Sequence, residues 1–297
     1  MSDYMIRAMA GNQELRCAAV SSRDLLEEAR RAHGTSPLAS AALGRTMSGA
    51  LMMSGMLKND DDLITVRLDG DGPLGAIVVT ADYHGRVKGY VQHPQVWLPL
   101  KENGHLDVGR AVGKGLLTVI RDLDSMNSYT GQTEIRTGEI AEDLTYYFAE
   151  SEQVPSSMGL GVLVDTDQSI RRSGGFLVQL MPSASEETIT RLEQNLSEIR
   201  SVTDMLEDGF TPEQMLGEVL RGFDDPEITE RMPVRFYCSC SRDRVERALM
   251  LISGEDLQSL IDEDRGAELA CQFCGKTYRF GTEDLIRIRL RSLNRGN

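Results

Sequence analysis

The chain has 297 residues, of which 40% are hydrophobic and 26% charged, and its formal net charge at pH 7 is -14. This length exceeds what one hydrophobic core comfortably serves, so we expect a large domain and at least one smaller module. The acidic charge disfavours nonspecific binding of nucleic acid or of anionic membranes, and we expect neither as a partner.

The N-terminal segment and the most apolar window argue against export and against membrane insertion. "MSDYMIRAMAGNQELR" has no basic segment followed by an apolar run and a small-residue cleavage site, so no secretory signal is expected. Residues 37–57 approach the length of a membrane span, but Arg45 and many Ser, Gly and Ala residues favour a helix packed in the core. We therefore expect a cytoplasmic protein whose thiols are reduced.

Residues 1–182 mix β-branched runs with turn signals and predict a large N-terminal α+β domain. Long helices among consecutive hairpins favour this class over an alternating parallel fold. One helix is expected from about Arg23 to a stop at Gly34, and another from Ser36 and Pro37 to about Lys58. The expected strands and hairpins lie in "LITVRLDGDG", "LGAIVVTADYHGRVKGYVQ", "GLLTVIRDL", "GVLVDTDQSI" and "GGFLVQLMP".

Residues 183–232 change in period and in charge, and they predict an amphipathic helical linker. The segment holds 13 acidic and 4 basic side chains, a net charge of -9. "TPEQ" predicts a second helix with Thr211 and Gln214 as the two halves of a capping box. Either the apolar faces of these two helices become exposed when a partner leaves them, or the helices are a fixed connector packed on the main domain. One face of the first helix, which is expected to end at Gly209, carries Ile189, Leu192, Leu196, Ile199 and Leu206.

Residues 233–297 predict a small C-terminal α+β module. Their 10 acidic and 11 basic side chains give a net charge of +1, so the composition changes at this boundary. "DDPEITERMP" predicts a turn-rich exit from the linker. The elements expected after it are a short strand at 234–237, a helix capped by Ser241 and running through Ile252, a helix at about 255–262, and a hairpin at 267–280.

Four of the five cysteines lie in this module as two close pairs. Cys238 and Cys240 stand in "FYCSCSRDRV", and Cys271 and Cys274 in "ELACQFCGKTYRF". One short pair from each of two turns supplies the four tetrahedral ligands of zinc, with sulfur at roughly 2.3 Å. We expect one zinc ion bound by these four thiolates, and it supplies much of the folding free energy of a module with few large apolar side chains.

The spacing alone favours a purely structural zinc, but the chemistry of the two pairs leaves a response to oxidants open. Four thiolates leave a net negative charge on the site, which makes it electron-rich and open to attack by peroxide. Each pair is near enough to close locally, Cys238 with Cys240 and Cys271 with Cys274. A disulfide ring that spans a single residue is strained and comparatively easy to reduce, so reversible oxidation is plausible on geometric grounds.

Other motifs give weaker signals. "GDGPLG" matches G-x-G-x-x-G at Gly70, Gly72 and Gly75, but a strand-like segment follows where a dinucleotide site needs a helix, so we interpret it as a hairpin loop. The four histidines have no metal-ligand spacing. Cys17 stands alone and is expected to be a small buried side chain. No catalytic arrangement is recognisable, and we expect no enzymatic activity.

Two alternatives come from the same module. A zinc-ribbon protein that binds nucleic acid is favoured by an arginine-rich end and disfavoured by the overall acidity. A thiol oxidoreductase that uses Cys271 and Cys274 lacks the βαβ context of such enzymes. The arginines near the C-terminus are Arg287, Arg289, Arg291 and Arg295.

With "MPVRFYCSCSRDRV" and "CQFCGKTYRF", the chain resembles the bacterial redox-regulated chaperone family of 33-kDa heat-shock proteins. "AALGRTM", "GDGPLGAIV", "YYFAESEQVPSS" and "GGFLVQLMP" resemble other recurrent segments of that family, so the resemblance covers essentially the whole chain. It implies a reduced, zinc-bound, inactive form. It also implies an oxidised form with Cys238–Cys240 and Cys271–Cys274 disulfides, which loses zinc, unfolds its C-terminal part, dimerises and holds unfolding client proteins.

Overall fold

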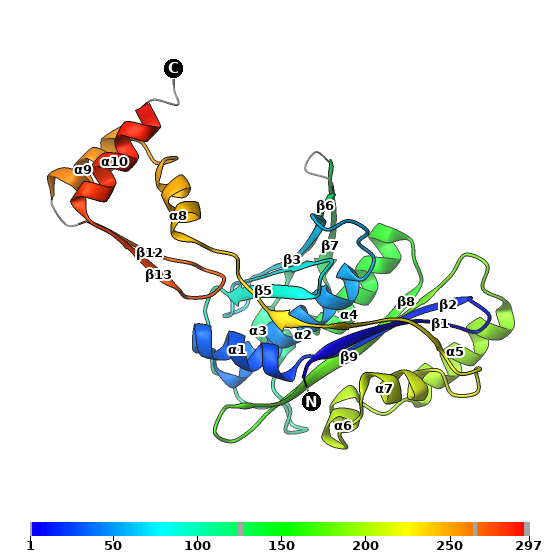
Figure 1. Ribbon diagram of the computed structural model, residues 1–297. Helices are drawn as coiled ribbons and strands as arrows, with labels where there is room; N and C mark the ends of the chain where they lie inside the picture. The colour runs from blue at the N-terminus through cyan, green and yellow to red at the C-terminus, as the bar shows by residue number, and fades with distance from the viewer. Residues whose placement is uncertain (1, 124–126, 264–265, 294–297) are drawn as a thin grey trace. The chain divides into compact units, whose positions relative to one another are not determined.

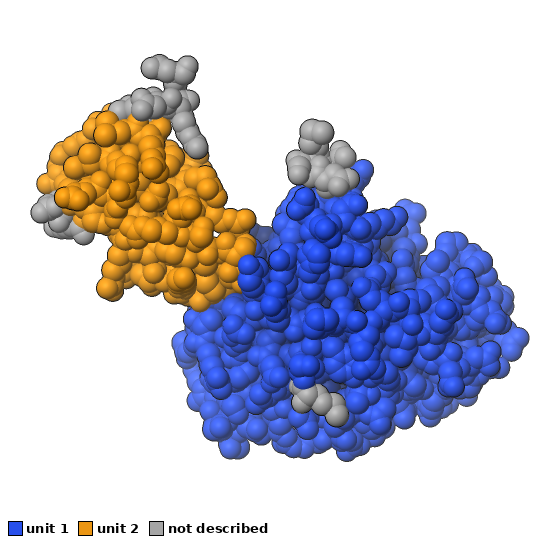
Figure 2. Space-filling view, in the orientation of Figure 1, with its two compact units in different colours: residues 1–237 blue, residues 238–297 orange. Residues whose placement is uncertain are grey.

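The computed structural model describes residues 2–123, 127–263 and 266–293. The chain divides into two compact units, Met1–Tyr237 and Cys238–Asn297, which Figure 1 shows as ribbons and Figure 2 in blue and orange. The first unit contains two β-sheets with helices around them, and the second contains a hairpin and three helices. The predicted α+β class is therefore confirmed.

The first sheet of unit 1 is antiparallel throughout, with strand order β10-β1-β2-β9-β8. Its central strands β2 and β9 are rich in small and β-branched residues, and most of their side chains are buried. The strands are β1 (Tyr4–Ala10), β2 (Leu15–Ser21), β8 (Ser156–Val164), β9 (Ile170–Leu180) and β10 (Glu227–Pro233).

The second sheet of unit 1 has the order β11-β5-β4-β3-β6-β7, and only the β11–β5 pair is parallel. In β3, buried Ile64, Val66 and Leu68 alternate with more exposed neighbours, as expected for a strand with one face on the core. The strands are β3 (Leu63–Gly70), β4 (Ala76–Asp82), β5 (Arg86–Val91), β6 (Gly115–Leu123), β7 (Asn127–Ile135) and β11 (Arg235–Phe236).

Helix α2 (Pro37–Ser54) lies between the two sheets and contacts strands of both, so nearly all of its residues are buried. Ser36 caps it by accepting a hydrogen bond from the Ala39 amide, as the sequence predicts. Among the described residues, no helix combines the length and apolar character needed to cross a membrane. The neighbouring helices are α1 (Arg23–His33), α3 (Val108–Val112), α4 (Ile140–Tyr147) and the π-helical turn Phe148–Glu152.

Three short helices cover the other face of the first sheet: α5 (Glu186–Glu198), α6 (Val202–Glu207) and α7 (Pro212–Val219). The prediction of one continuous helix up to Gly209 is wrong. Ile199 adopts an extended conformation, and the Ser201 side chain caps a new helix by accepting from the Asp204 amide. The predicted capping box of Thr211 and Gln214 is present at the start of α7.

These helices share an apolar core with the sheet, and we call this core the cover cluster. It includes residues of β1, β2 and β9 on one side and of α5, α6 and α7 on the other. Its buried members are Ile6, Ala8, Ala10, Leu15, Cys17, Ala19, Phe176, Val178, Leu192, Val202, Met205, Leu206, Met215, Leu216, Val219 and Leu220.

The segment expected to be a turn-rich exit contains strand β10, and this prediction is wrong. β10 pairs with β1 from Tyr4 opposite Pro233 to Met9 opposite Glu227. Its side chains are exposed or half-buried, so the strand carries no apolar alternation that a sequence pattern could reveal. The short strand predicted just beyond it is present as β11.

Unit 2 contains the predicted hairpin and helices, with Ser241 capping the first helix through the Arg244 amide. A third helix that the sequence analysis did not predict follows the hairpin. The elements are α8 (Arg242–Leu249), α9 (Gly254–Asp262), β12 (Ala267–Ala270), β13 (Thr277–Phe280) and α10 (Thr282–Leu293). The buried core cluster of this unit consists of Leu249, Leu257, Tyr278, Phe280, Leu285 and Ile288.

Candidate metal centre

The four clustered cysteines of unit 2 meet at one point. Cys238 and Cys240 lie in the extended segment before α8, and Cys271 and Cys274 lie in the turn between β12 and β13. All four Sγ atoms are within 4.8 Å of one another. The structure thus brings together every residue that the sequence analysis named as a metal ligand.

The β12–β13 turn is shaped so that both of its thiols point to the same place. The Cys271 carbonyl accepts hydrogen bonds from the Cys274 amide at 3.3 Å and from the Gly275 amide at 2.8 Å, while the Cys271 amide donates to the Lys276 carbonyl at 2.9 Å. Gly275 has a φ of +70°, in the left-handed region that glycine adopts without strain. "CQFCGK" therefore closes into a tight turn with two sulfur atoms on its inner side.

The donor set fits a tetrahedrally bound metal ion. A tetrahedron with metal–sulfur bonds of roughly 2.3 Å has sulfur–sulfur edges of about 3.8 Å. The Sγ atoms of Cys238 and Cys271 are 3.7 Å apart, and those of Cys240 and Cys274 are 3.3 Å apart. Four cysteines so placed could hold a metal ion, with thiolates from two separate segments closing the site.

Tyr278 on β13 extends the site beyond its four thiols. Its hydroxyl donates a hydrogen bond to the Cys240 Sγ at 3.1 Å, while its ring is buried in the core cluster of unit 2. Burial alone would raise the pKa of Cys240, but the hydrogen bonds from Tyr278 and the neighbouring thiols lower it to about 7. Burial raises the pKa of Cys238 and of Cys274. In the metal-free site Cys240 therefore ionises more readily than Cys238 or Cys274.

Of the arginines near the C-terminal end, two pair with carboxylates, while the Nε of half-buried Arg289 has no hydrogen-bond partner among the described residues. Arg287 pairs with Asp284 on the same helix, and Arg291 pairs with Glu246 at 3.3 Å. Arg295 lies outside the described residues. These ion pairs reduce the support for the nucleic-acid alternative, because a side chain that binds phosphate must first give up its carboxylate.

Two other sequence motifs have structural roles. Gly70 ends β3, and Gly72 and Gly75 lie in its connection to the antiparallel strand β4, so the prediction of a hairpin loop is confirmed. Cys17 is buried in the cover cluster, and its burial raises the pKa of the thiol to about 12. This confirms Cys17 as a small core side chain, and the high pKa makes it a poor nucleophile.

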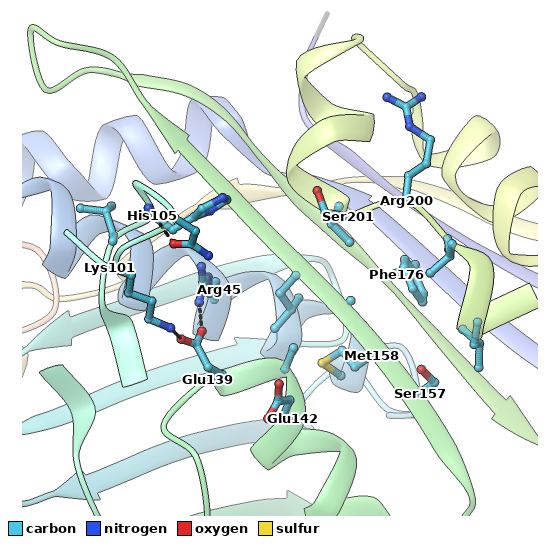
Figure 3. Close-up of a pocket in the computed structure, with 18 residues that line it drawn as sticks. Arg45, Lys101, His105, Glu139, Glu142, Ser157, Met158, Phe176, Arg200 and Ser201 are labelled. Atoms are coloured by element: carbon cyan, nitrogen blue, oxygen red, sulfur yellow. Dashed lines mark hydrogen bonds and ion pairs between the residues drawn. The ribbon is translucent and has the colours of Figure 1, made fainter. Parts of the chain in front are cut away.

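A pocket of about 530 Å³ in unit 1 was not foreseen from the sequence (Figure 3). Edge strand β8 forms one wall, and Ile199 to Val202 between α5 and α6 form another. Inside it, the Glu139 carboxylate accepts from Arg45 at 2.5 Å and from Lys101 at 2.6 Å, so these cations are already paired. Its lining comes from six separate segments, and no local motif could have indicated it.

Comparison with known proteins agrees with this architecture over the whole chain. The sequence profile of the family described as Hsp33 protein matches residues 3–281. The 33 kDa chaperonins of Agathobacter rectalis and Bacillus subtilis are 51% and 48% identical to the chain; each alignment covers 97% of this chain, and 100% and 98% of those proteins.

The likeness extends to three-dimensional structure. The crystal structure of the 33 kDa chaperonin (heat shock protein 33 homologue) of Thermotoga maritima superposes with a TM-score of 0.90 at 32% identity. The match covers 99% of this chain and 100% of that one. Sequence and fold therefore point to the same group of proteins.

Proposed function

Because the chain belongs to the Hsp33 family, we propose that it is a redox-regulated, ATP-independent holdase that protects unfolding proteins in the cytoplasm during oxidative stress. In the reduced, inactive form one zinc ion is bound by Cys238, Cys240, Cys271 and Cys274. The observation that carries the proposal is the convergence of these four thiols in a unit that has only a small apolar core.

Zinc suits this donor set because it takes four thiolates in a tetrahedron and has no redox chemistry of its own. The electrons lost on oxidation must therefore come from sulfur. One thiolate of a pair attacks a peroxide oxygen, which gives a sulfenic acid and releases hydroxide. The second thiolate attacks that sulfur, so that an S–S bond forms and a second hydroxide leaves. Each disulfide takes up one peroxide, and its sulfur atoms no longer act as anionic ligands.

We propose that the pairs formed are Cys238–Cys240 and Cys271–Cys274. Each closes within one short segment, so neither ties the two segments together once the metal has left. Structural zinc contributes on the order of 10 kcal/mol or more to the folding of small modules. Without it, the core cluster of unit 2 is too small to keep the unit folded.

The client surface in this proposal is the apolar surface that the linker covers at rest. We treat residues 1–182 as the core domain, 183–232 as the linker and 233–297 as the switch. Helices α5, α6 and α7 bury the cover cluster against the first sheet. Their release would expose apolar faces on both the helices and the sheet. Such surface must be hidden in the resting protein, because exposed patches of this kind bind indiscriminately or aggregate. We include homodimerisation of the oxidised form in the proposal.

The test is a peroxide titration of the reduced, zinc-loaded protein. Released zinc, helical signal and suppression of the aggregation of an unfolding client are measured on the same samples. Cys17 adds a fourth reading, because it lies in the cover cluster and becomes open to alkylation only when the helices leave. Zinc release, loss of helix, Cys17 alkylation and suppression should rise together.

The variant Cys238→Ser removes one ligand and is expected to lose both metal retention and the graded response to peroxide. Cys17→Ser is the control for the alkylation reading and should keep the switch. Suppression that is as strong before oxidation as after it would rule out the switch.

A further inference from the structure

Residues 227–237, which we call the strap, form the outermost strand of both sheets of unit 1. β10 lies along β1 at the edge of the first sheet, and β11 lies along β5 at the edge of the second (Figure 1). Backbone hydrogen bonds hold the end of the strap to the β5 edge: the Arg235 amide donates to the Gly85 carbonyl at 3.0 Å and the Tyr237 amide to the Val87 carbonyl at 2.9 Å. One short segment thus closes two sheet edges.

Along β10, the strap is held mainly by backbone hydrogen bonds to β1 and by ion pairs between exposed or half-buried side chains. No side chain of β10 is buried, and Ile228 is 44% exposed. Glu230 pairs with Arg7 at 2.8 Å, and Arg231 pairs with Glu213. Solvent-accessible pairs of this kind contribute little to stability. Val234 and Phe236 are the buried apolar residues of the segment.

The strand beneath the strap is anchored independently of it. In β1, Met5, Ile6 and Ala8 are almost fully buried, and β2 pairs along the whole length of the strand. If the strap leaves, β1 remains in place with a row of unpaired amides and carbonyls. Such an edge is a template for any extended chain that can supply a strand.

We propose that the β1 edge, once the strap has left it, binds extended segments of unfolding proteins by antiparallel strand addition. The strap is followed directly by Cys238, so the inference rests on the proposed function: unfolding of the zinc module removes the fold that holds the strap's C-terminal end. The two-residue β5 edge offers the same chemistry over a shorter length.

The kind of client segment that binds the β1 edge can be inferred from how the strap itself is bound. None of the β10 side chains is buried, so this edge recognises main chain and places little demand on sequence. A holdase for many clients needs that kind of recognition. The segment that fits is a strand of about six residues, matching the pairing of Tyr4 to Met9 with Pro233 to Glu227.

Amide hydrogen exchange tests this on the full chain in three states: reduced, oxidised, and oxidised with unfolding citrate synthase. β8 is the opposite edge of the same sheet, which the strap does not cover, and it serves as the internal control. We expect exchange in β1 to quicken at least tenfold on oxidation and to slow again when client is bound, with a much smaller change in β8. If β1 stays protected after oxidation, or stays equally open with client bound, strand addition is overturned.

Aggregation of citrate synthase is followed in the same samples. An oxidised protein that fails to suppress it contradicts the proposed function. An oxidised protein that suppresses aggregation without slowing exchange in β1 contradicts only the strand-addition proposal.

A charge-reversal series tests whether the strap protects the β1 edge in the reduced protein. Glu230→Arg places a like charge opposite Arg7 and should quicken β1 exchange in the reduced protein by about three- to tenfold. Glu227→Arg makes the same charge change elsewhere in β10 and is the matched control. Adding Arg7→Glu to Glu230→Arg should restore the slow rate. Equal exchange in both single variants would show that this contact does not hold the edge closed.

Discussion

A single hydroxyl links the core of unit 2 to its candidate metal centre. Tyr278 donates to the Cys240 Sγ at 3.1 Å, and its ring belongs to the core cluster of that unit. A donor of this kind orients the ligand and stabilises its anionic form. The residue therefore connects the packing of the hairpin to the strength with which the site holds a metal.

Tyr278→Phe removes this hydrogen bond but keeps the buried ring. We expect zinc to be held about 10- to 100-fold less tightly, as is usual when a ligand's outer partner is lost. The measurement is a competition between the reduced protein and a zinc chelator. Tyr237→Phe is the control, since Tyr237 is half-exposed and lies outside unit 2. Equal affinity in the two variants would contradict a role for the Tyr278 hydroxyl in metal binding.

Asp3 gives a prediction for the dependence of stability on pH. The residue is 5% exposed, and its carboxylate accepts a hydrogen bond from the Leu25 amide at 2.8 Å. Burial raises its pKa from 3.8 to about 6, against the lowering effect of that hydrogen bond. Between these two values the folded protein binds more protons than the unfolded chain. The contribution of the Asp3 carboxyl to the free energy of unfolding is thus fully present below pH 3.8, and it is lost as the pH rises through 6.

Asp3→Asn should abolish this dependence while keeping an oxygen to accept from Leu25. Wild-type protein should lose about 2 to 3 kcal/mol more than the variant between pH 4 and pH 7, because one pKa unit corresponds to about 1.4 kcal/mol. Urea unfolding of both proteins at the two pH values gives the difference. Asp61→Asn, at an exposed carboxyl that is not among the groups acting on Asp3, is the control. An unchanged pH dependence in Asp3→Asn would contradict the raised pKa.

At the scale of elements, the sequence predicted best what is encoded locally. Ser36 and Thr211 mark helix starts that the structure confirms, because a cap needs only residues within one turn. The four cysteines that meet in unit 2 were indicated for the same reason, since each pair lies within four residues. Tyr278 was missed because its place beside Cys240 depends on folding of the whole unit.

Elements that depend on distant partners were not predicted. β10 pairs with β1 more than 200 residues away, and its exposed side chains give no period-two pattern. α10 has buried Leu285 and Ile288 but also exposed Ile286 and Leu290, so its apolar residues do not mark one face. For residues 183–232 the predicted apolar face is confirmed in part, since Leu192 and Leu206 lie in the cover cluster. The break between the helices at Ile199 was not predicted, because it has no strong sequence signal.

At the scale of the whole molecule, the two units differ in how they are stabilised. In unit 1, α2 is enclosed by two sheets and α5, α6 and α7 add a further layer, so burial of apolar side chains extends through several layers. Unit 2 has one small cluster beside its four thiols. Below about 70 residues, a core of that size supplies too little free energy without a metal or cross-links.

Removing zinc without oxidation should therefore unfold unit 2 and spare the central strands of the first sheet in unit 1. We expect a chelator, added to the reduced protein without oxygen, to quicken amide exchange in α8, α9, α10 and the β12–β13 hairpin by more than tenfold. Exchange in β2 and β9, at the centre of the first sheet, should not change. Restoring zinc should restore protection, whereas magnesium should not, because it prefers oxygen ligands. Protection of α8 to α10 that persists in the zinc-free protein would mean that the apolar cluster alone folds unit 2, and oxidation would then need another way to open it.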